Sequence, residues 1–319
     1  MKRLFFRCLF AAALTAAFSA QALAARLLIP VGEVVGLSLR DGSVTVAAFH
    51  ELHGAAARDA GITIGDEILA LDGHRIDRAE DLFDALKRSG GTVTVTLRRD
   101  GREKQVRLRP AATKDGPRLG VYVREGVTGI GTVTWFDPDS GAIGCLGHGI
   151  SNNRGDLAPM ESGWVYDAAV ESVKRGLAGE PGQLKGAVSS EIPIGSLRSN
   201  TARGVFGSCS GWKGEPLPVA DSAQVHPGAA QILSNIHGDE VRFFDIEILR
   251  CRPDTDGRDL LLKVTDPLLL EATGGIVAGM SGSPIIQDGH LVGAVTHVLV
   301  NDPTRGYGIF IENMLEAAE

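Results

Sequence analysis

The chain has 319 residues, enough for two domains, and 44% of them are hydrophobic, enough for two real cores. Its 41 glycines and 5% aromatic content indicate many turns and short strands. A formal net charge of −7 excludes nucleic acid as an expected partner, because phosphate binding needs a basic surface. Neither a Cys-x-x-Cys nor a His-Glu-x-x-His pattern occurs, so we expect no metal site and no cofactor.

Residues 1–24 have the pattern of a secretory signal. Lys2, Arg3 and Arg7 form a basic start, an apolar run follows from Cys8 to Ala20, and Ala22-Leu23-Ala24 offers a small-residue cleavage site. The run is shorter than the ~20 residues of a membrane span; an uncleaved anchor is the alternative. Loss of these three charges takes the formal net charge from −7 to −10, since residues 1–24 hold no Asp or Glu. We therefore expect an exported protein.

After loss of the signal the chain keeps three cysteines, Cys145, Cys209 and Cys251. An odd number cannot form a complete disulfide framework. One bridge and buried free thiols are both compatible with this count.

A first domain is predicted over residues 26–112. Short strands are expected at 27–30, 34–39, 44–49, 93–98 and 105–108, with a helix from Arg78 to Arg88 that carries Leu82, Phe83 and Leu86 on one face. Between them, Ala60 to Gly73 reads Ala-Gly-Ile-x-x-Gly-Asp-x-Ile-Leu-x-Leu-Asp-Gly. This run and the single helix resemble a PDZ domain.

The PDZ resemblance implies capture of a C-terminal peptide or of a segment of this same chain. The peptide would add as a strand beside Val35–Leu39, against the helix, with its carboxylate held by backbone N–H groups near Gly36. The groove residues expected on this basis are Gly36, Leu37, Leu39, Leu82 and Leu86. The alternative is that the four leucines are only core.

The polar turn at 113–117 separates this unit from a second domain, predicted over residues 118–319. Many short apolar runs bounded by Gly and Pro predict an all-β barrel or sandwich. Helical signal is confined to residues 167–175 and to the last residues.

The second domain contains Gly279-Met280-Ser281-Gly282-Ser283-Pro284, followed by a predicted β-hairpin with an Asp288-Gly289 turn. A serine becomes a nucleophile when a base takes its proton and donors hold the oxyanion. Flanking glycines allow the N–H groups of Gly279 and Ser281 to form that oxyanion hole. The motif resembles the Gly-x-Ser-Gly-(Gly/Ser)-Pro signature of trypsin-like serine peptidases; the alternative is a Gly/Ser-rich turn without chemistry.

His148, between two glycines at a strand end, is the favoured base, and His226 and His297 are its rivals. For the acid that orients the base, Asp266 ends an apolar strand before a proline. It is favoured over Asp245, which alternates with apolar residues as the solvent face of a strand does.

A signal or anchor, a PDZ domain, Gly-x-Leu-Gly-His, Lys-Val-Thr-Asp-Pro and Gly-Met-Ser-Gly-Ser-Pro, in this order, are similar to the stage IV sporulation protein B (SpoIVB) serine peptidases. The resemblance places the family's catalytic residues on His148, Asp266 and Ser281, and implies a PDZ domain followed by a trypsin-like double barrel. It further implies an endopeptidase between the two membranes of a developing endospore. There such an enzyme processes itself and cleaves a membrane-bound regulator, which leads to activation of a late sigma factor. A catalytically inactive PDZ scaffold and a general quality-control peptidase of the cell envelope are the alternatives.

Two departures from trypsin-like enzymes stand out. Met280 occupies the position where those enzymes carry an aspartate that pairs with a freed N-terminus, so control must come from elsewhere, and the PDZ domain is the expected lever. Only 15 residues separate Asp266 from Ser281, whereas trypsin-like chains place the acid far upstream.

Overall fold

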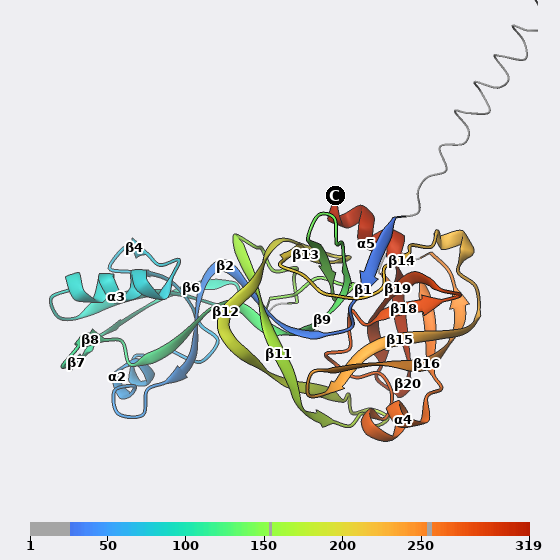
Figure 1. Cartoon of the computed structure of the whole chain (residues 1–319). Coiled ribbons are helices and arrows are strands. Elements are labelled where there is room, and N and C mark those ends of the chain that lie inside the picture. Colours follow the sequence, from blue (N-terminus) through green and yellow to red (C-terminus); the bar gives the residue numbers. More distant parts are fainter. Residues whose placement is uncertain (1–25, 153–154, 254–256) are drawn as a thin grey trace, which may run out of the picture.

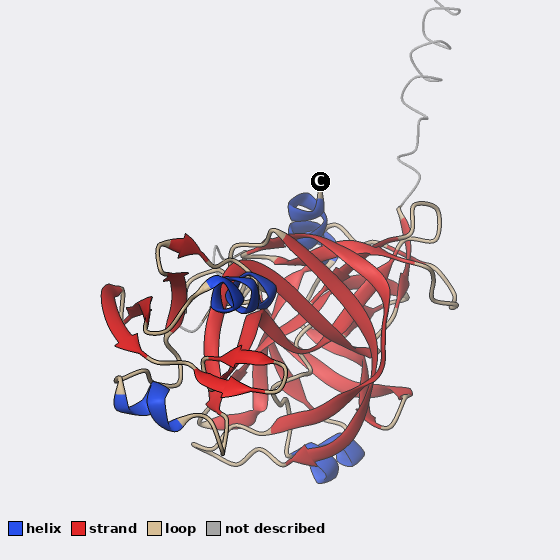
Figure 2. Ribbon diagram, turned by 90° about the vertical axis from the view of Figure 1, so that its left-hand side faces the viewer, coloured by secondary structure: helices blue, strands red, loops and turns tan. Residues whose placement is uncertain are grey.

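The computed structural model describes residues 26–152, 155–253 and 257–319, so the predicted signal at 1–24 lies outside the described residues. A small unit around helix α3 (Ala79–Arg88) stands beside a larger unit built almost entirely of strands (Figure 1). Strands predominate in both units (Figure 2). The mainly β class predicted from the sequence is confirmed.

The small unit is the one predicted as a PDZ domain. Besides α3 it contains α2 (Ala55–Asp59), β3 (Glu67–Leu71), β4 (His74–Arg75), β5 (Val93–Arg99), β6 (Arg102–Leu108), β7 (Ala111–Thr113) and β8 (Gly116–Arg118). Its core forms because α3 turns Leu82, Ala85 and Leu86 inward onto apolar strand residues such as Ile68 and Val95. The carboxylate of the fully buried Asp66 accepts from the Arg99 guanidinium at 2.6 Å. This ion pair links the turn that precedes β3 to the end of β5.

The first barrel of the large unit is a closed ring of six strands. Pairings run from β2 (Val34–Phe49) to β9 (Val121–Phe136), β10 (Ala142–Cys145), β13 (Gly204–Cys209), β12 (Gln183–Thr201) and β11 (Ser162–Lys174), and β11 returns to β2. The short strand β1 (Leu27–Pro30) pairs with the end of β9 at Trp135 and Phe136, and also pairs with β14 (Leu217–Pro218). The helix predicted near residues 167–175 is wrong, because β11 extends to Lys174 and turns Ala168 and Val170 inward with the two-residue period of a strand.

The second barrel is also closed and six-stranded. It consists of β15 (Gly228–His237), β16 (Glu240–Cys251), β17 (Leu260–Val264), β18 (Pro284–Gln287), β19 (His290–Leu299) and β20 (Asp302–Phe310). A 3-10 turn (Ser222–Gln224) precedes it, helix α4 (Pro267–Thr273) follows β17, and helix α5 (Ile311–Ala318) ends the chain. The large unit thus has the double-barrel architecture predicted for a trypsin-like peptidase domain.

The hydrophobic cores divide the chain differently from the predicted boundaries at 26–112 and 118–319. Val35, Leu37 and Leu39, in the first half of β2, pack in the first barrel, whereas Val44 and Val46, in the second half, pack in the PDZ core. Strand β9 is divided in the same way, since its register with β2 runs through both units. The PDZ domain is therefore inserted into the first barrel by two continuous antiparallel strands, and residues 27–39 belong to the peptidase unit.

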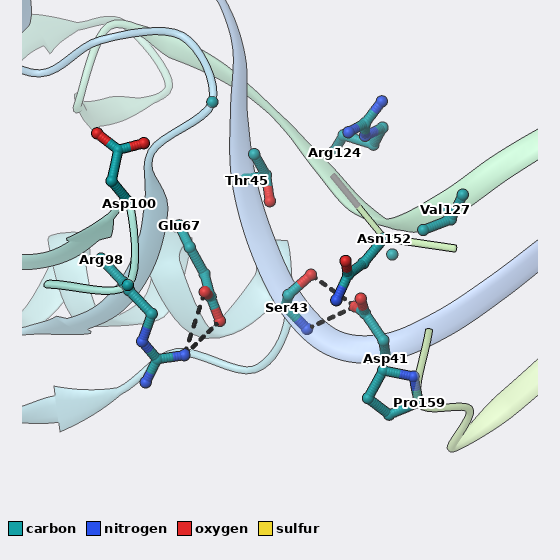
Figure 3. Close-up of a pocket in the computed structure, with 13 residues that line it drawn as sticks. Asp41, Ser43, Thr45, Glu67, Arg98, Asp100, Arg124, Val127, Asn152 and Pro159 are labelled. Atoms are coloured by element: carbon teal, nitrogen blue, oxygen red, sulfur yellow. Dashed lines mark hydrogen bonds and ion pairs between the residues drawn. The ribbon is translucent and has the colours of Figure 1, made fainter. Parts of the chain in front are cut away.

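A polar cavity of about 340 Å³ lies at this junction. Figure 3 shows Glu67 and Arg98 of the PDZ unit on one side, joined at 3.1 Å, and Asp41 held by Ser43 on β2. Glu67 and Arg98, which line this cavity, form an ion pair within the PDZ unit. No histidine or cysteine is among the described residues that line it.

None of the helices in the described ranges is long and apolar enough to span a membrane. The three cysteines predicted for the mature chain are all free thiols.

Candidate active site

Ser281 lies in a tight turn that leads directly into β18, a strand of the second barrel. Gly279 and Gly282 on either side adopt φ of +99° and +98°, in the left-handed region that favours glycine. A Cβ on Gly282 would stand 2.1 Å from the Thr132 carbonyl oxygen, so this turn fits against β9 of the first barrel only as glycine. The hairpin of β18 and β19 and its Asp288-Gly289 turn are as predicted.

The backbone N–H groups of the turn differ in whether they have a hydrogen-bond acceptor. The Met280 N–H donates to Val277 and its side chain is fully buried in the second-barrel core. In the described part of the chain, the N–H groups of Gly279 and Ser281 have no acceptor. These are the two amides predicted to hold an oxyanion.

His148 reaches the same place from the first barrel, just after β10. Leu146 and Gly147 have φ of 71° and 69°, and this bend presses Gly147 against Thr296 and Ile309 of the second barrel. The His148 Nδ1 lies 2.9 Å from the Gly149 carbonyl, which accepts from it when Nδ1 carries the proton. Burial lowers the pKa of His148 despite this hydrogen bond, so the imidazole is neutral at pH 7.

The structure brings His148 and Ser281 together on one cavity of about 680 Å³, between the two barrels. Its wall is mainly apolar and includes Leu37, Ile130, Leu146, Leu157 and Ala278. No carboxylate is among the described residues that line it. The Ser281 hydroxyl donates to the Thr296 carbonyl at 2.7 Å, so it must rotate to reach His148.

His297, a rival base, also lines this cavity, and its ring centroid lies 5.2 Å from that of His148. Burial, then the neighbouring His148 and Arg258, lower the pKa of His297 to about 4. The other rival, His226, is exposed and pairs with Asp288 at the far end of the β18–β19 hairpin.

The structure does not bring Asp266 to this cavity. One carboxylate oxygen accepts from the N–H groups of Leu268 and Leu269, which makes Asp266 the N-cap of α4, and the other accepts from the Asp245 N–H. His297 pairs with Tyr307, which pairs with Leu261, and Asp266 lies five residues beyond Leu261. At about 3.3 Å per strand residue, these five residues place Asp266 roughly 16 Å from His297 along the strand direction. Asp245 binds Gln231 on the barrel surface and does not line the cavity either.

The PDZ groove is not where it was predicted. Gly36, Leu37 and Leu39 have β9 on one side and β11 on the other, so this segment has no free edge for a peptide strand. Leu82 and Leu86 do line a groove, a cavity of about 700 Å³ whose opposite wall is residues 118–123.

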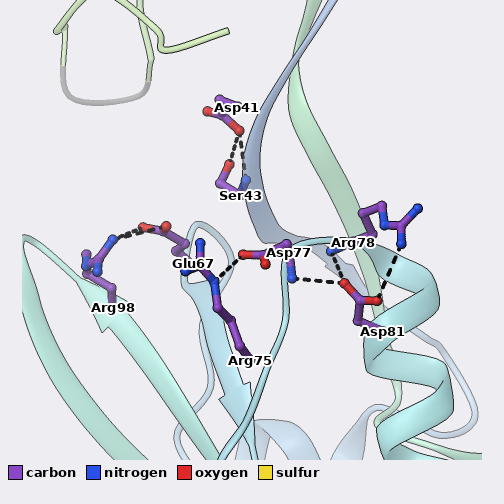
Figure 4. Close-up of polar contacts among 8 residues, drawn as sticks. All are labelled: Asp41, Ser43, Glu67, Arg75, Asp77, Arg78, Asp81 and Arg98. Atoms are coloured by element: carbon purple, nitrogen blue, oxygen red, sulfur yellow. Dashed lines mark hydrogen bonds and ion pairs between the residues drawn. The ribbon is translucent and has the colours of Figure 1, made fainter. Parts of the chain in front are cut away.

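In that groove the first half of β9 has an unpaired edge. Val121, Tyr122 and Val123 pair with β2 on one side only, among the described residues. Helix α3 faces them. In its first turn the Asp81 carboxylate accepts from the N–H groups of Asp77 and Arg78, just before the helix (Figure 4). The Leu-Gly-Val-Tyr-Val run from Leu119 marks this wall in the sequence, but the predicted boundary assigned it to the peptidase domain.

The described residues contain no cluster of three or more His, Cys, Asp or Glu side chains that could hold a metal ion.

Two family models and several solved structures are similar to parts of this chain. A family model described as PDZ domain matches residues 35–109. The PDZ domain of an SdrC-like protein from Listeria monocytogenes is 23% identical, covering 25% of this chain and 85% of that chain with a TM-score of 0.22. The inactive form of the Rv3671c protease is 15% identical, covering 60% of this chain and 84% of that chain with a TM-score of 0.35. The active form from M. tuberculosis is 13% identical, with 62% and 73% covered and a TM-score of 0.37.

None of the curated proteins compared with the chain matches it. The family model described as SpoIVB peptidase S55 matches residues 115–315, which is more than half of the chain. The chain therefore belongs to the SpoIVB peptidase S55 family, and it is a serine peptidase with a PDZ domain.

Proposed function

We propose that this peptidase is exported, processes itself and cleaves a membrane-associated regulatory protein, with Ser281 as nucleophile and His148 as base. The observation that carries the catalytic assignment is the shared cavity, where Ser281 and His148 lie beside two amides without acceptors in the described chain. Membership of the SpoIVB family supports the regulatory substrate. It also supports a place in the cell envelope or the intermembrane space of a developing endospore, in the pathway that activates a late sigma factor.

In the proposed reaction the Ser281 hydroxyl turns from Thr296, gives its proton to the free nitrogen of His148 and attacks the peptide carbonyl carbon. The N–H groups of Gly279 and Ser281 hold the oxyanion. Each such donor lowers the activation barrier by about 3–4 kcal/mol in well-studied cases. His148 then gives the proton to the leaving amine as the C–N bond breaks. Water, deprotonated by His148, releases the acyl group.

The pH dependence follows from the base. His148 must be neutral to accept the proton, and burial lowers its pKa below the ordinary value of 6.5. Activity should therefore persist below pH 6.5 and fall only as the pH passes through the lowered pKa.

The groove between α3 and residues 118–123 is the proposed site for a C-terminal peptide or a segment of the chain itself. The unpaired edge of Val121–Val123 supplies backbone groups for an added peptide strand, while Leu82, Phe83 and Leu86 supply an apolar wall. Binding of micromolar order, about 8 kcal/mol, is expected for such a contact.

The test is labelling of the purified protein with a fluorophosphonate probe, followed by mapping of the labelled peptide by mass spectrometry. We expect labelling at Ser281 that is lost in Ser281→Ala and strongly slowed in His148→Ala. His226→Ala is the matched control, because His226 is exposed and outside the cavity, and it should label as the wild type does. Labelling of another serine, or none in the folded wild type, would refute the assignment. Fragments that form in the wild type and not in Ser281→Ala would identify self-processing.

A further inference from the structure

A serine peptidase must hold its histidine in one orientation and one tautomer. In this chain a neighbouring carbonyl, that of Gly149, is the hydrogen-bond acceptor for the His148 Nδ1, which leaves Nε2 free to receive the serine proton. This bond is local, spanning one residue, and it fixes the ring only with respect to its own loop. No carboxylate among the described residues of the cavity is available to hold the ring with respect to Ser281.

The ring that does approach His148 from the serine's own barrel is His297. Its centroid lies 5.2 Å from that of His148, with 34° between the ring planes. His297 directly follows Thr296, whose carbonyl accepts from the Ser281 hydroxyl, so one short segment of β19 contacts both reacting side chains. The His297 Nδ1 is buried and has no hydrogen-bond partner within the described chain, which distinguishes it from an ordinary structural histidine.

We propose that His297 is the positioning residue of this site: its ring packs on the His148 imidazole and holds it over Ser281. It supplies only the orienting part of what a triad carboxylate does, because the Gly149 carbonyl already holds the tautomer of His148. The inference rests on the proposed function of His148 and Ser281. His297 exchanges no proton; the proton passes from Ser281 to His148 and then to the leaving amine.

The charge of the surroundings fits this role. His148 and His297 are the only titratable side chains among the described residues that line the cavity, and the positive charge of Arg258 also acts on His297. With its pKa lowered to about 4, His297 is neutral at pH 7 and does not repel the imidazolium that forms on His148. A neutral ring beside the base also keeps water from it, and burial is the largest cause of the lowered His148 pKa.

The experiment measures the rate of fluorophosphonate labelling at Ser281 as a function of pH in His297→Ala and His297→Phe. We expect His297→Ala to label about 10–100-fold more slowly, because His148 loses its packing surface. The acidic limb of its pH profile should move to higher pH, since His148 becomes more solvated. His297→Phe restores the ring and should recover most of the rate and the original limb. His237→Ala, on the exposed part of β15, is the matched control and should equal the wild type.

Thermal unfolding of each variant separates positioning from folding. Where His297→Ala unfolds, His297→Gln replaces it as the variant without a ring, and the same slower rate is expected. A ringless, folded variant that labels at the wild-type rate with an unmoved acidic limb would overturn the role of His297 and leave the proposed function standing. Absence of labelling in the folded wild type would overturn both.

Discussion

Substitution of Asp266 by Asn and by Ala distinguishes a catalytic acid from a helix cap. The structure gives Asp266 three backbone donors, Leu268 and Leu269 at 2.9 and 3.0 Å and Asp245 at 3.3 Å, and no histidine. Asn caps a helix about as well as Asp does, so Asp266→Asn should unfold within about 1 kcal/mol of the wild type. Asp266→Ala loses the cap and should be destabilised by about 1–2 kcal/mol, a fall in Tm of roughly 2–8 °C for a unit of this size.

The catalytic consequence is the sharper part of this prediction. A triad aspartate replaced by Asn lowers kcat about 10⁴-fold in the best-studied serine peptidase, because the histidine takes the wrong tautomer. In this chain the Gly149 carbonyl is the acceptor for His148, so Asp266→Asn should label with the fluorophosphonate probe within about threefold of the wild type. The assay compares the labelling rate with the Tm of the same preparation. An Asp266→Asn variant with wild-type Tm and a rate reduced 100-fold or more would refute the reasoning and restore Asp266 as the acid.

Two further substitutions test the turn and the PDZ core. Gly282→Ala places a Cβ 2.1 Å from the Thr132 carbonyl at a φ of +98°, so it should abolish labelling at Ser281; labelling at the wild-type rate would mean that the barrels do not meet as closely as described. Arg99→Met removes the charged partner of the buried Asp66, which keeps only its hydrogen bonds from Thr63. It should lower the free energy of unfolding by about 2–3 kcal/mol at pH 7, below the 3–5 kcal/mol of a fully buried pair because Arg99 is 34% exposed. Burial raises the pKa of Asp66, but hydrogen bonds from Arg99 and Thr63 outweigh it and lower the pKa in the wild type. The wild type therefore keeps this contribution above the unfolded pKa and loses it as the pH falls through the folded pKa, so the deficit of Arg99→Met in denaturant titrations should shrink toward pH 4.

Local patterns predicted the geometry of the turn around Ser281. The β18–β19 hairpin follows from an Asp-Gly pair between apolar runs, and the glycines around Ser281 follow from the need for a left-handed backbone. His148 could be favoured because glycines on both sides allow the bend that carries it to the second barrel. Each of these features depends on a few neighbouring residues, so the sequence alone could predict this local geometry.

The acid was harder because one local pattern has two meanings. An aspartate between a strand and a proline is suited to a site at a strand end, and equally to an N-cap followed by proline at the first helical position. The short apolar run after Pro267 is α4, and the N–H groups of Leu268 and Leu269 in its first turn donate to the Asp266 carboxylate. Attention to the helix-start signal at Asp266-Pro267 would have favoured the cap.

The domain boundary and the PDZ groove depended on pairings between distant parts of the chain. Val35–Leu39 reads as an ordinary PDZ strand, and only its pairing with β9 and β11 places it inside the first barrel. The same pairing leaves the edge of Val121–Val123 free. No pattern within either segment specifies which strand lies beside it, so the order of strands had to come from the structure.

Strand β9 gives the inserted PDZ domain a direct mechanical path to the serine. Its first half forms a wall of the peptide groove, its middle lines the catalytic cavity at Gly129 and Ile130, and Thr132 then contacts the catalytic turn. The Thr132 hydroxyl donates to the Gly279 carbonyl at 2.8 Å, and the Thr132 N–H donates to the Ser281 carbonyl at 3.2 Å. These are the carbonyls of the two residues whose N–H groups are proposed to hold the oxyanion. We therefore expect a peptide that binds in the groove and shifts β9 to change the labelling rate at Ser281 through this continuous strand, whereas a PDZ domain on a flexible linker would have no such path.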